Sequence, residues 1–434
     1  MYGTLRTWLI ACSSTRACVN QRDSGLDLES AAKNRLWLCC TAGYKLTCLK
    51  PQCTKGPIIK SLHGDSKTRS IVFLASHSSA GGAQEIWANL AEGLAARGHR
   101  VSLMALYPLR ESVCETVPSL PWTYVAARQP KGPLAAAHIV FDLARIWRRN
   151  RPDLVFTAMP AANAAAALAA ALAGLHGRIV ISHHSPVETH SRNLNAFDSL
   201  TGSLRSVKAV ISVSRAVEAS LNGKPARYRA KLVTIHNAVP PRIETLLAHL
   251  GAAQAPRVMR NRRIVATGRL AAQKNYPLLI RAARDLANAT IDIVGNGPDE
   301  ATLRALAQDQ GGADRIHFLG HRPREEALAI CAGGDVFVQA SLFEGHSLGL
   351  IEAAKLGLPL VVSDVPSQIE GITARDGTRC GLTCGVDDPA GLARQINALL
   401  DNPPLYAQQA ALALRLGAEA TFADMLDTYE ALAS

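Results

Sequence analysis

The chain has 434 residues, of which 48% are hydrophobic and 5% aromatic, and its formal net charge at neutral pH is +12. This length exceeds one ordinary core, so we expect two domains of an alanine-rich α/β protein. Residues 1–69 carry 11 Lys and Arg against 4 Asp and Glu. The remainder has no basic stripe interleaved with aromatic residues, which argues against a nucleic-acid binder. Its mildly basic charge suits phosphate-bearing substrates or an anionic membrane face.

Cysteine usage and hydropathy argue against a zinc site and a membrane span. Six of the ten cysteines fall in the first 53 residues, and no pair has C-x2-C spacing. The apolar run before Cys12 is too short for a signal peptide. The one membrane-like stretch, 154–175, contains Pro160 and Asn163 and is mostly alanine, which favours a strand followed by a buried helix. We therefore expect a cytoplasmic protein, with the inner face of the cell membrane as a further option.

Residues 1–68 show no steady period, and we favour a disordered or non-native extension over a functional one. From Ser70 the pattern predicts a βαβ unit with a strand at 71–75, a helix at 84–97 and a strand at 101–106. Further strands are expected at 123–127, 154–159, 178–182, 209–214 and 232–236. Helical segments between them predict a parallel sheet and a first domain over 69–245.

An Ala-, Pro- and Arg-rich segment that extends to about residue 263 is interpreted as the connection to a second domain over 256–404. Its strands are expected at 264–268, 291–295, 316–320, 336–340, 360–363 and 381–384, again with helices between. A last helical stretch covers 405–432. Two doubly wound domains in series predict a ligand cleft between them.

The segment 340–357 carries the most informative chemistry. Glu344 follows an apolar strand at 335–341, and Glu352 lies eight residues later, about two turns into a helix. Ser347, Leu348 and Gly349 mark the helix start, where free backbone N–H groups attract phosphate. Two carboxylates that can accept sugar or ribose hydroxyls, beside N–H donors for a diphosphate, are what a nucleotide-sugar site requires.

Two further loops offer groups for a diphosphate. Gly268 ends a strand, and Arg269 and Lys274 follow it at the carboxyl end, where α/β sheets bind ligands. The alternative for both is a solvated surface cation. Gly295 lies in a tight turn at 294–298 that serves a plain β–α connection as well as ligand contact.

The first domain contributes a glycine pair and a histidine pair. Gly81 and Gly82 stand between the first strand and helix, where backbone amides can meet a phosphate or sugar, or simply form a tight turn. The full G-x-G-x-x-G fingerprint is absent, which argues against a dehydrogenase. His183 and His184 end the strand at 178–182 and either face the cleft or cap the strand.

Glu-x7-Glu followed by Ala-x-x-x-Gly just before a strand at 359–364 resembles the retaining glycosyltransferases of family 4, and the resemblance covers roughly residues 70 to 434. It implies the GT-B fold, with two Rossmann-like domains facing across a cleft and the segment 405–434 packing back toward the first. It also implies a nucleoside-diphosphate-sugar donor held mainly by the second domain. No metal or cofactor is expected, since no Asp-x-Asp motif stands in a suitable place.

The resemblance also implies roles for single residues. Arg269 and Lys274 hold the donor phosphates and stabilise the leaving group. Glu344 lies toward the transferred sugar, and Glu352 accepts hydrogen bonds from the ribose. His184, in preference to His183, contacts the donor sugar.

The same resemblance implies roles for the glycine loops, and it also concerns His346 and Glu370. The loops with Gly81, Gly82, Gly268 and Gly295, and the amides of residues 347–349, bind the donor. His346 departs from the family pattern, because many members carry an aromatic residue there. Glu370 resembles a further glutamate near the cleft.

We therefore expect a retaining hexosyltransferase that transfers sugar to a glycan or lipid-linked acceptor in cell-surface polysaccharide or glycolipid synthesis. A nucleotide-sugar epimerase or a non-catalytic nucleotide-sugar-binding module of the same fold is the alternative. The basic stretch 145–151, with an exposed-looking Trp147, could contact anionic lipid, although we favour a solvated helix end.

Overall fold

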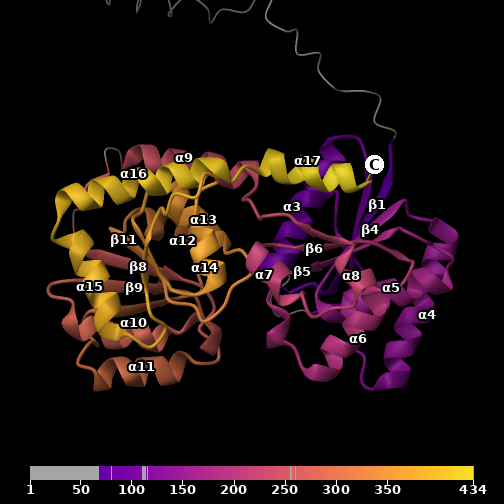
Figure 1. Cartoon of the computed structure of the whole chain (residues 1–434), viewed down its shortest axis with the longest axis horizontal. Helices are drawn as coiled ribbons and strands as arrows, with labels where there is room; N and C mark the ends of the chain where they lie inside the picture. The colour runs from indigo at the N-terminus through magenta and orange to yellow at the C-terminus, as the bar shows by residue number, and fades with distance from the viewer. Residues whose placement is uncertain are drawn as a thin grey trace, which may run out of the picture. The chain divides into compact units, whose positions relative to one another are not determined.

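The structure is a computed structural model that describes residues 68–79, 81–109, 114, 116–254, 257–259 and 261–433. The expectation of a disordered or non-native extension falls outside this range, apart from Thr68. Residues 67–434 form one compact unit that contains two parallel sheets (Figure 1). We call the part built on the first sheet the first lobe and the part built on the second sheet the second lobe.

The first sheet has the strand order β3-β2-β1-β4-β5-β6-β7, and all its pairings are parallel. Its strands are β1 Ser70–His77, β2 Arg100–Tyr107, β3 Trp122–Tyr124, β4 Leu154–Ala158, β5 Ile179–His183, β6 Val207–Ser212 and β7 Leu232–Thr234. Its helices are α3 Gly82–Ala96, α4 Pro133–Asn150, α5 Pro160–Leu172, α6 Arg192–Gly202, α7 Arg215–Ser220 and α8 Ala226–Arg229, with a 3-10 turn η3 at Val187–Thr189. The chain order reverses between β1 and β4, which is the switch point where such sheets bind ligands.

The second sheet has the order β10-β9-β8-β11-β12-β13 and is also parallel throughout. Its strands are β8 Arg263–Thr267, β9 Thr290–Val294, β10 Ile316–Gly320, β11 Val336–Gln339, β12 Leu360–Ser363 and β13 Leu382–Cys384. The helices between them are α10 Tyr276–Ala282, α11 Glu300–Asp309, α12 Arg324–Ala332, α13 Leu348–Lys355, α14 Pro366–Gly371 and α15 Pro389–Leu400, with 3-10 turns η4 Ala272–Lys274 and η5 Ala283–Asp285. The doubly wound α/β class expected from the alternation of strands and helices is confirmed.

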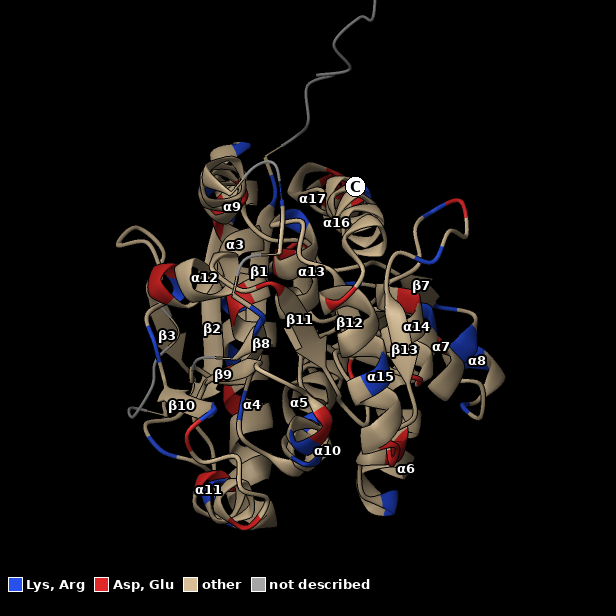
Figure 2. Cartoon of the chain, turned by 90° about the vertical axis from the view of Figure 1, so that its left-hand side faces the viewer, with Lys and Arg blue, Asp and Glu red and all other residues tan. Residues whose placement is uncertain are grey.

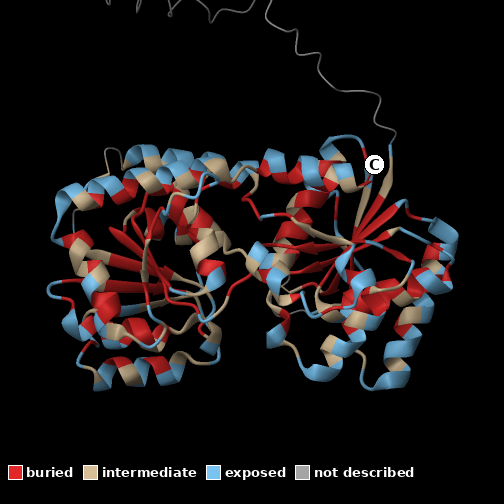
Figure 3. Ribbon diagram, in the orientation of Figure 1, coloured by how far each residue is buried: buried red, intermediate tan, exposed pale blue. Residues whose placement is uncertain are grey.

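Both sheets are covered on both faces, which explains their nearly continuous apolar strands. In the first lobe, α3 packs on one face and α4 and α5 on the other. In the second lobe, α10, α11 and α15 cover one face, and α12 and α13 the other. The buried residues concentrate in the strands and on the inner sides of the helices (Figure 3). The charged residues lie mostly on outer helices and loops (Figure 2).

The segment expected as a connection contains a helix, α9 Pro241–Ala253. Ile243 and Leu247, one turn apart, are buried in the core of the second lobe with Leu328 and Ile351. The second lobe therefore begins before residue 245, because this apolar stripe needs a surface to cover and finds it on α12 and α13.

The C-terminal segment forms two helices instead of the single stretch expected, α16 Pro403–Glu419 and α17 Phe422–Ala433. The first packs on α13 of the second lobe, and the second packs on α3 of the first lobe (Figure 1). Tyr429 of α17 lies between two aromatic rings, 5.2 Å from Phe156 and 6.0 Å from Trp87. The break near Ala420 lets one amphipathic sequence bury its apolar sides against two different lobes.

The stretch 154–175 forms strand β4 and the buried helix α5, as expected. Within the described residues, no helix is long and apolar enough to cross a membrane. The expectation of an exposed Trp147 is wrong: its side chain is 1% exposed and packs with α5 in the core of the first lobe. Its arginine neighbours are exposed because they occupy the opposite side of α4.

Replacement of Tyr429 by alanine tests how α17 holds the first lobe. We expect Tyr429→Ala to lower the free energy of unfolding by about 3 kcal/mol, because it empties a site between two buried rings. Urea denaturation measures this change. Thr428→Ala, an exposed change on the same helix, should stay within about 0.5 kcal/mol of wild type. Equal effects of the two variants would contradict the packing role of α17.

Candidate functional site

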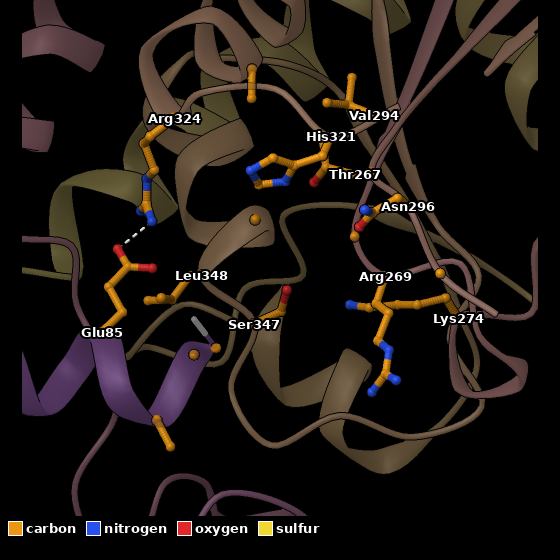
Figure 4. A pocket seen from close by; sticks show the side chains of 18 of the residues that line it. Glu85, Thr267, Arg269, Lys274, Val294, Asn296, His321, Arg324, Ser347 and Leu348 are labelled. Atoms are coloured by element: carbon orange, nitrogen blue, oxygen red, sulfur yellow. Dashed lines mark hydrogen bonds and ion pairs between the residues drawn. The ribbon is translucent and has the colours of Figure 1, made fainter. Parts of the chain in front are cut away.

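A cavity of about 1490 Å³ is lined by both lobes. The loops that follow β1, β8, β9 and β10 contribute to it, together with the end of β5 and the segment 344–352. In Figure 4, side chains from both lobes are seen around this space. The carboxyl ends of the two sheets therefore face one hollow, in agreement with the cleft expected from the sequence.

Arg269 and Lys274 leave the loop after β8 with different surroundings. Lys274 Nζ lies 2.7 Å from Glu344 Oε1, and the two side chains are 16% and 10% exposed. Arg269 is exposed, and its side chain has no hydrogen-bonded or ion-paired partner among the described residues. Figure 4 shows its guanidinium extending away from Lys274. The loop after β8 thus brings to the cavity one neutralised cation and one cation whose charge is free to attract an anion.

Glu344 is held in place by several groups of its own lobe. Its backbone N–H donates to Ser367 Oγ at 3.1 Å, and Gln273 Nε2 lies 3.5 Å from its second carboxylate oxygen. Gln273 also donates to the carbonyl of Phe343 at 3.0 Å. The carboxylate is therefore fixed at the cavity wall beside the ammonium of Lys274, even without a ligand.

Two glycines in the loops after β8 and β9 are required by close backbone approach. Gly268 and Gly295 have φ angles of +138° and +142°, which side-chain-bearing residues rarely adopt. A Cβ atom on Gly295 would lie 2.0 Å from the carbonyl oxygen of Gly268, and one on Gly297 would lie 2.2 Å from that of Leu270. Loop packing is sufficient reason for these glycines, although Gly268 and Gly295 also line the cavity.

The N-terminus of α13 opens into the cavity. Ser347 is the N-cap; its hydroxyl accepts from the Leu350 N–H at 3.4 Å and donates to Gln339 at 2.8 Å. Leu348 and Gly349 are the first helical residues, so their N–H groups belong to the orphan donors of a helix start. Glu352 lies one turn into this helix, and not the two turns expected, because the helix begins at Leu348.

Glu352 is tied to a residue that sequence reasoning missed. Arg324, the first residue of α12, donates from Nη2 to Glu352 and from Nη1 to Glu85 of α3 in the first lobe. Burial raises the pKa of Glu352 to about 7, because the effect of Arg324, which favours the ionised form, is smaller. The carboxylate proposed for the ribose thus titrates near neutral pH.

The first-lobe wall contains Gly81, Gly82 and His184. A Cβ atom on Gly82 would have no neighbour within 4 Å, so close packing does not require a glycine at this position. Burial, followed by the effect of His183, lowers the pKa of His184 to about 4. The Ser182 hydroxyl donates to the Thr157 carbonyl, so at 2.9 Å it accepts from His184 Nε2. His184 is then neutral, with the Nδ1 lone pair unprotonated.

His183 lies behind this wall and does not line the cavity. Its Nε2 is 2.7 Å from the hydroxyl of Tyr228, which donates to Asp198 at 3.0 Å. Lys224 completes the group with Nζ 2.6 Å from Asp198. These groups pair with one another in the interior, although Asp198 Oδ1 has no hydrogen-bond partner among the described residues. The structure therefore brings His184 into the site and leaves His183 in the interior.

Glu370 does not lie in the cavity but lines a second one of about 910 Å³. It accepts from the amides of Arg215 and Ala216 at 2.7 and 2.8 Å, and lies 2.7 Å from His236 Nε2. Burial alone would raise its pKa, but these hydrogen bonds outweigh burial and lower it. Glu370 thus lies between the lobes, beside the first cavity and not in it, and joins the second lobe to the first.

His346 is also engaged between the lobes. Its Nδ1 accepts from the Asn237 N–H at 3.2 Å, and its ring stacks on His236 at 4.8 Å. Burial, with the neighbouring His236, lowers its pKa to about 3, so the ring is neutral. His346 therefore still offers a ring that stacks, as an aromatic residue would, and in addition it accepts a hydrogen bond.

Arg324 and Glu85 are the main omissions of the sequence reasoning. The only signal for Arg324 is its position at the start of a helix, at the end of the short loop that follows strand β10, where ligand-facing residues gather. Nothing in the local pattern of Glu85 distinguishes it from a surface carboxylate in a first helical turn. Within the described residues, no group of three or more His, Cys, Asp or Glu side chains is placed to hold a metal ion.

Two family models match the chain. "Glycosyltransferase Family 4" matches residues 80–242, and "Glycosyl transferases group 1" matches residues 253–414, so together they span more than half of its length. Among curated proteins, the chain is 36% identical over 154 residues to the D-inositol 3-phosphate glycosyltransferase of Mycobacteroides abscessus, covering 31% of this chain and 34% of that protein. It is 30% identical over 145 residues to the lipopolysaccharide core biosynthesis glycosyltransferase LpsD of Rhizobium meliloti, covering 33% of this chain and 40% of the relative.

Solved structures show the same architecture at low sequence identity. HepE of Anabaena, in complex with UDP-glucose, superposes with a TM-score of 0.68 at 18% identity, over 84% of this chain and 99% of the other. WaaG, a glycosyltransferase involved in lipopolysaccharide biosynthesis, superposes with a TM-score of 0.65 at 15% identity over 84% and 99%. These likenesses establish the GT-B fold. The sequence matches, by contrast, span only about a third to two fifths of the two curated relatives.

Proposed function

The chain belongs to the glycosyltransferases of family 4, and from that premise we propose that it transfers a hexosyl group from a nucleoside-diphosphate sugar to a hydroxyl acceptor with retention of configuration. Arg269 is the observation that carries the proposal. It is an exposed cation without a partner among the described residues, in the same cavity as Lys274 and the N-terminus of α13. A free cation, a second cation and orphan amides suit the two charges of a diphosphate.

The donor would extend along the cavity from Glu352 to Glu344. The diphosphate would bind Arg269, Lys274 and the amides of residues 347–349. The ribose hydroxyls would donate to Glu352, and the transferred sugar would lie toward Glu344 and His184. A volume of about 1490 Å³ leaves room for an acceptor as well, since drug-sized ligands occupy about 300–1,000 Å³.

The chemical step would depend on positively charged and N–H groups that are already in position before the reaction begins. Negative charge grows on the diphosphate as the bond to the sugar breaks, and Arg269, Lys274 and the helix amides lie where they can stabilise it. The 2.7 Å contact of Lys274 with Glu344 supports a fixed position for that ammonium. Neutral His184 offers a hydrogen-bond acceptor to a sugar hydroxyl. By family resemblance the departing phosphate oxygen would take the acceptor proton.

The relatives suggest the substrate classes to test first. HepE was solved with UDP-glucose, and LpsD is named for lipopolysaccharide core biosynthesis. We therefore propose a UDP-sugar donor and a glycan or lipid-linked acceptor in cell-surface polysaccharide or glycolipid synthesis. An epimerase would convert the donor without any acceptor, and a binding module would show no turnover at all.

A transfer assay tests this function. We expect release of nucleoside diphosphate from one of the UDP-, GDP- or ADP-sugars in the presence of a glycan or lipid-linked acceptor. Lys274→Ala should reduce kcat by about 100-fold or more, because it removes a cation that opposes charge growing in the transition state. Arg284→Ala, which removes an exposed cation outside the cavity, should leave the rate unchanged. Near-normal turnover of Lys274→Ala would remove Lys274 from the mechanism, and donor conversion without acceptor would favour an epimerase.

The pKa of Glu352 predicts a pH dependence of donor binding. A carboxylate accepts ribose hydrogen bonds better than a carboxylic acid does, so affinity for a UDP-sugar should rise as pH increases from 6 to 8. Isothermal calorimetry of Glu352→Gln should show about tenfold weaker binding and no such rise. A pH rise that persists in the variant would assign the titration to another group.

The same ionisation affects folding with the opposite sign. Between pH 4.5, the ordinary pKa of a glutamate, and about 7, folded Glu352 holds a proton that the unfolded chain releases. Its contribution to the free energy of unfolding therefore falls as the pH rises through this window.

Contact with an anionic membrane is supported by the outer face of α4. Leu134 and Phe141 are 78% and 63% exposed, and Arg145 and Arg148 follow at helical spacing on the same side. An apolar stripe that leads into arginines is typical of a helix lying on lipid. The buried Trp147 takes no part in this face.

Cosedimentation with phosphatidylglycerol vesicles tests the membrane proposal. We expect Phe141→Ser to weaken binding about tenfold, because the ring would no longer enter the lipid. Leu414→Ser, an exposed apolar residue on α16, serves as the matched control. Equal binding of wild type and both variants would argue against α4 as the contact.

A further inference from the structure

Three charged side chains from three helices meet at one end of the cavity. Arg324 of α12 bridges Glu85 of α3 and Glu352 of α13 through its two terminal nitrogens. The contact with Glu85 crosses from the second lobe to the first and joins residues 239 positions apart in the sequence (Figure 4). The side chains of Glu85, Arg324 and Glu352 are 30%, 27% and 14% exposed, so this charge cluster is partly shielded from water.

Arginine is suited to this place because its planar fork can donate to two carboxylates at once. A lysine would offer one compact charge and could not hold both in fixed geometry. Among the described residues, the buried Nε of Arg324 has no hydrogen-bond partner. The guanidinium therefore directs its two outer nitrogens to Glu85 and Glu352, and its Nε–H is left without an acceptor.

This bridge is separate from the polar contacts that Glu370 makes between the lobes. Glu370, His236 and Arg215 join the lobes at the second cavity and do not line the first. Glu85 and Arg324 line the first cavity and not the second. The ion pair thus crosses between the lobes at the first cavity, where a change in the separation of the lobes would alter it directly.

Through Arg324, the orientation of Glu352 depends on whether Glu85 is within reach. With the lobes together, Glu85 takes one arm of the fork and orients the other toward Glu352. With the lobes apart, the guanidinium loses its first-lobe partner and both its rotamer and its hold on Glu352 become less defined. Because Glu352 lies in the second lobe, this connection lets the position of the first lobe affect the carboxylate that would bind the ribose.

We propose that Arg324 is a positioning residue that orients Glu352 for the nucleotide ribose only when Glu85 of the opposite lobe holds it. The proposal rests on the nucleotide-sugar site proposed above. It assigns Glu85 an indirect part in nucleotide binding, without contact to the ligand, and it makes affinity for the nucleotide depend on the approach of the two lobes.

A double-mutant cycle on UDP binding tests this connection. We expect Arg324→Met to weaken UDP binding about 10- to 30-fold and Glu85→Gln about 3- to 10-fold. The variant with both changes should bind within twofold of Arg324→Met, because Glu85 acts only through Arg324. Additive losses in the double variant would show that Glu85 contacts UDP directly and would overturn the proposal, as would unchanged affinity in either single variant.

Two matched controls separate this effect from a change of net charge or of helix stability. Glu92→Gln removes an exposed carboxylate from α3. Glu325→Gln, on α12 next to Arg324, breaks an exposed ion pair with Arg242 of α9. Both residues lie outside the cavity, and both variants should bind UDP as wild type does. A loss of binding in these controls equal to that of Glu85→Gln would overturn the proposal.

Kinetics with the donor give an independent readout. Glu85→Gln should raise the KM for the sugar nucleotide by the factor seen in UDP binding and leave kcat within twofold, because the ribose contact exists before and during the reaction. A fall in kcat without a change in KM would point to a general structural defect and contradict the positioning role. If wild type binds none of UDP, GDP and ADP, the proposed function fails and this inference with it; if wild type binds UDP and the cycle is additive, only the inference fails.

Discussion

The balance of charge inside the cavity is the condition on which the site depends. Lys274 neutralises Glu344, and Arg324 bridges Glu85 and Glu352, whereas Arg269 keeps its charge unpaired among the described residues. A partly buried charge is costly unless it is paired, so the pairs hold the walls in place without ligand. Arg269, whose charge is unpaired, is then the group that a diphosphate would pair with most readily. The pKa of Glu352 is raised mainly by burial and further by the charge of Glu85, and the opposing effect of Arg324 is smaller.

Backbone contacts set the geometry in which these charges act. A Cβ atom on Gly295 would collide with the carbonyl of Gly268, and one on Gly345 would lie 2.2 Å from the carbonyl of His184. The first contact fixes the two second-lobe loops that line the first cavity. The second brings the first lobe against the segment that carries Glu344. Since backbone cannot yield as a flexible side chain does, these glycines define how closely the charged groups can approach.

The two lobes are linked at several places, and each link bears on the site. The helix pair α16 and α17 joins the cores, since Tyr429 packs on Trp87 and Phe156 while α16 packs on α13. Glu370 binds backbone amides of α7 beside the second cavity. Arg324 reaches Glu85 across the first cavity. Together, the hydrophobic and polar links hold the lobes as one unit.

Local pattern determined much of this protein. The strands, the alternating helices, the carboxylates at positions 344 and 352 and the cations at 269 and 274 could all be predicted, because burial periodicity and strand ends are local properties of a chain. The fold class followed from these, and the resemblance to family 4 added the arrangement of two domains. Tertiary structure alone decided that Lys274 pairs with Glu344, that Trp147 is buried, that α9 joins the second lobe and that the last helix breaks near Ala420. It also decided the bridge from Arg324 to Glu85, since a contact between residues 239 positions apart depends on how whole lobes pack and has no counterpart in the spacing of neighbouring residues.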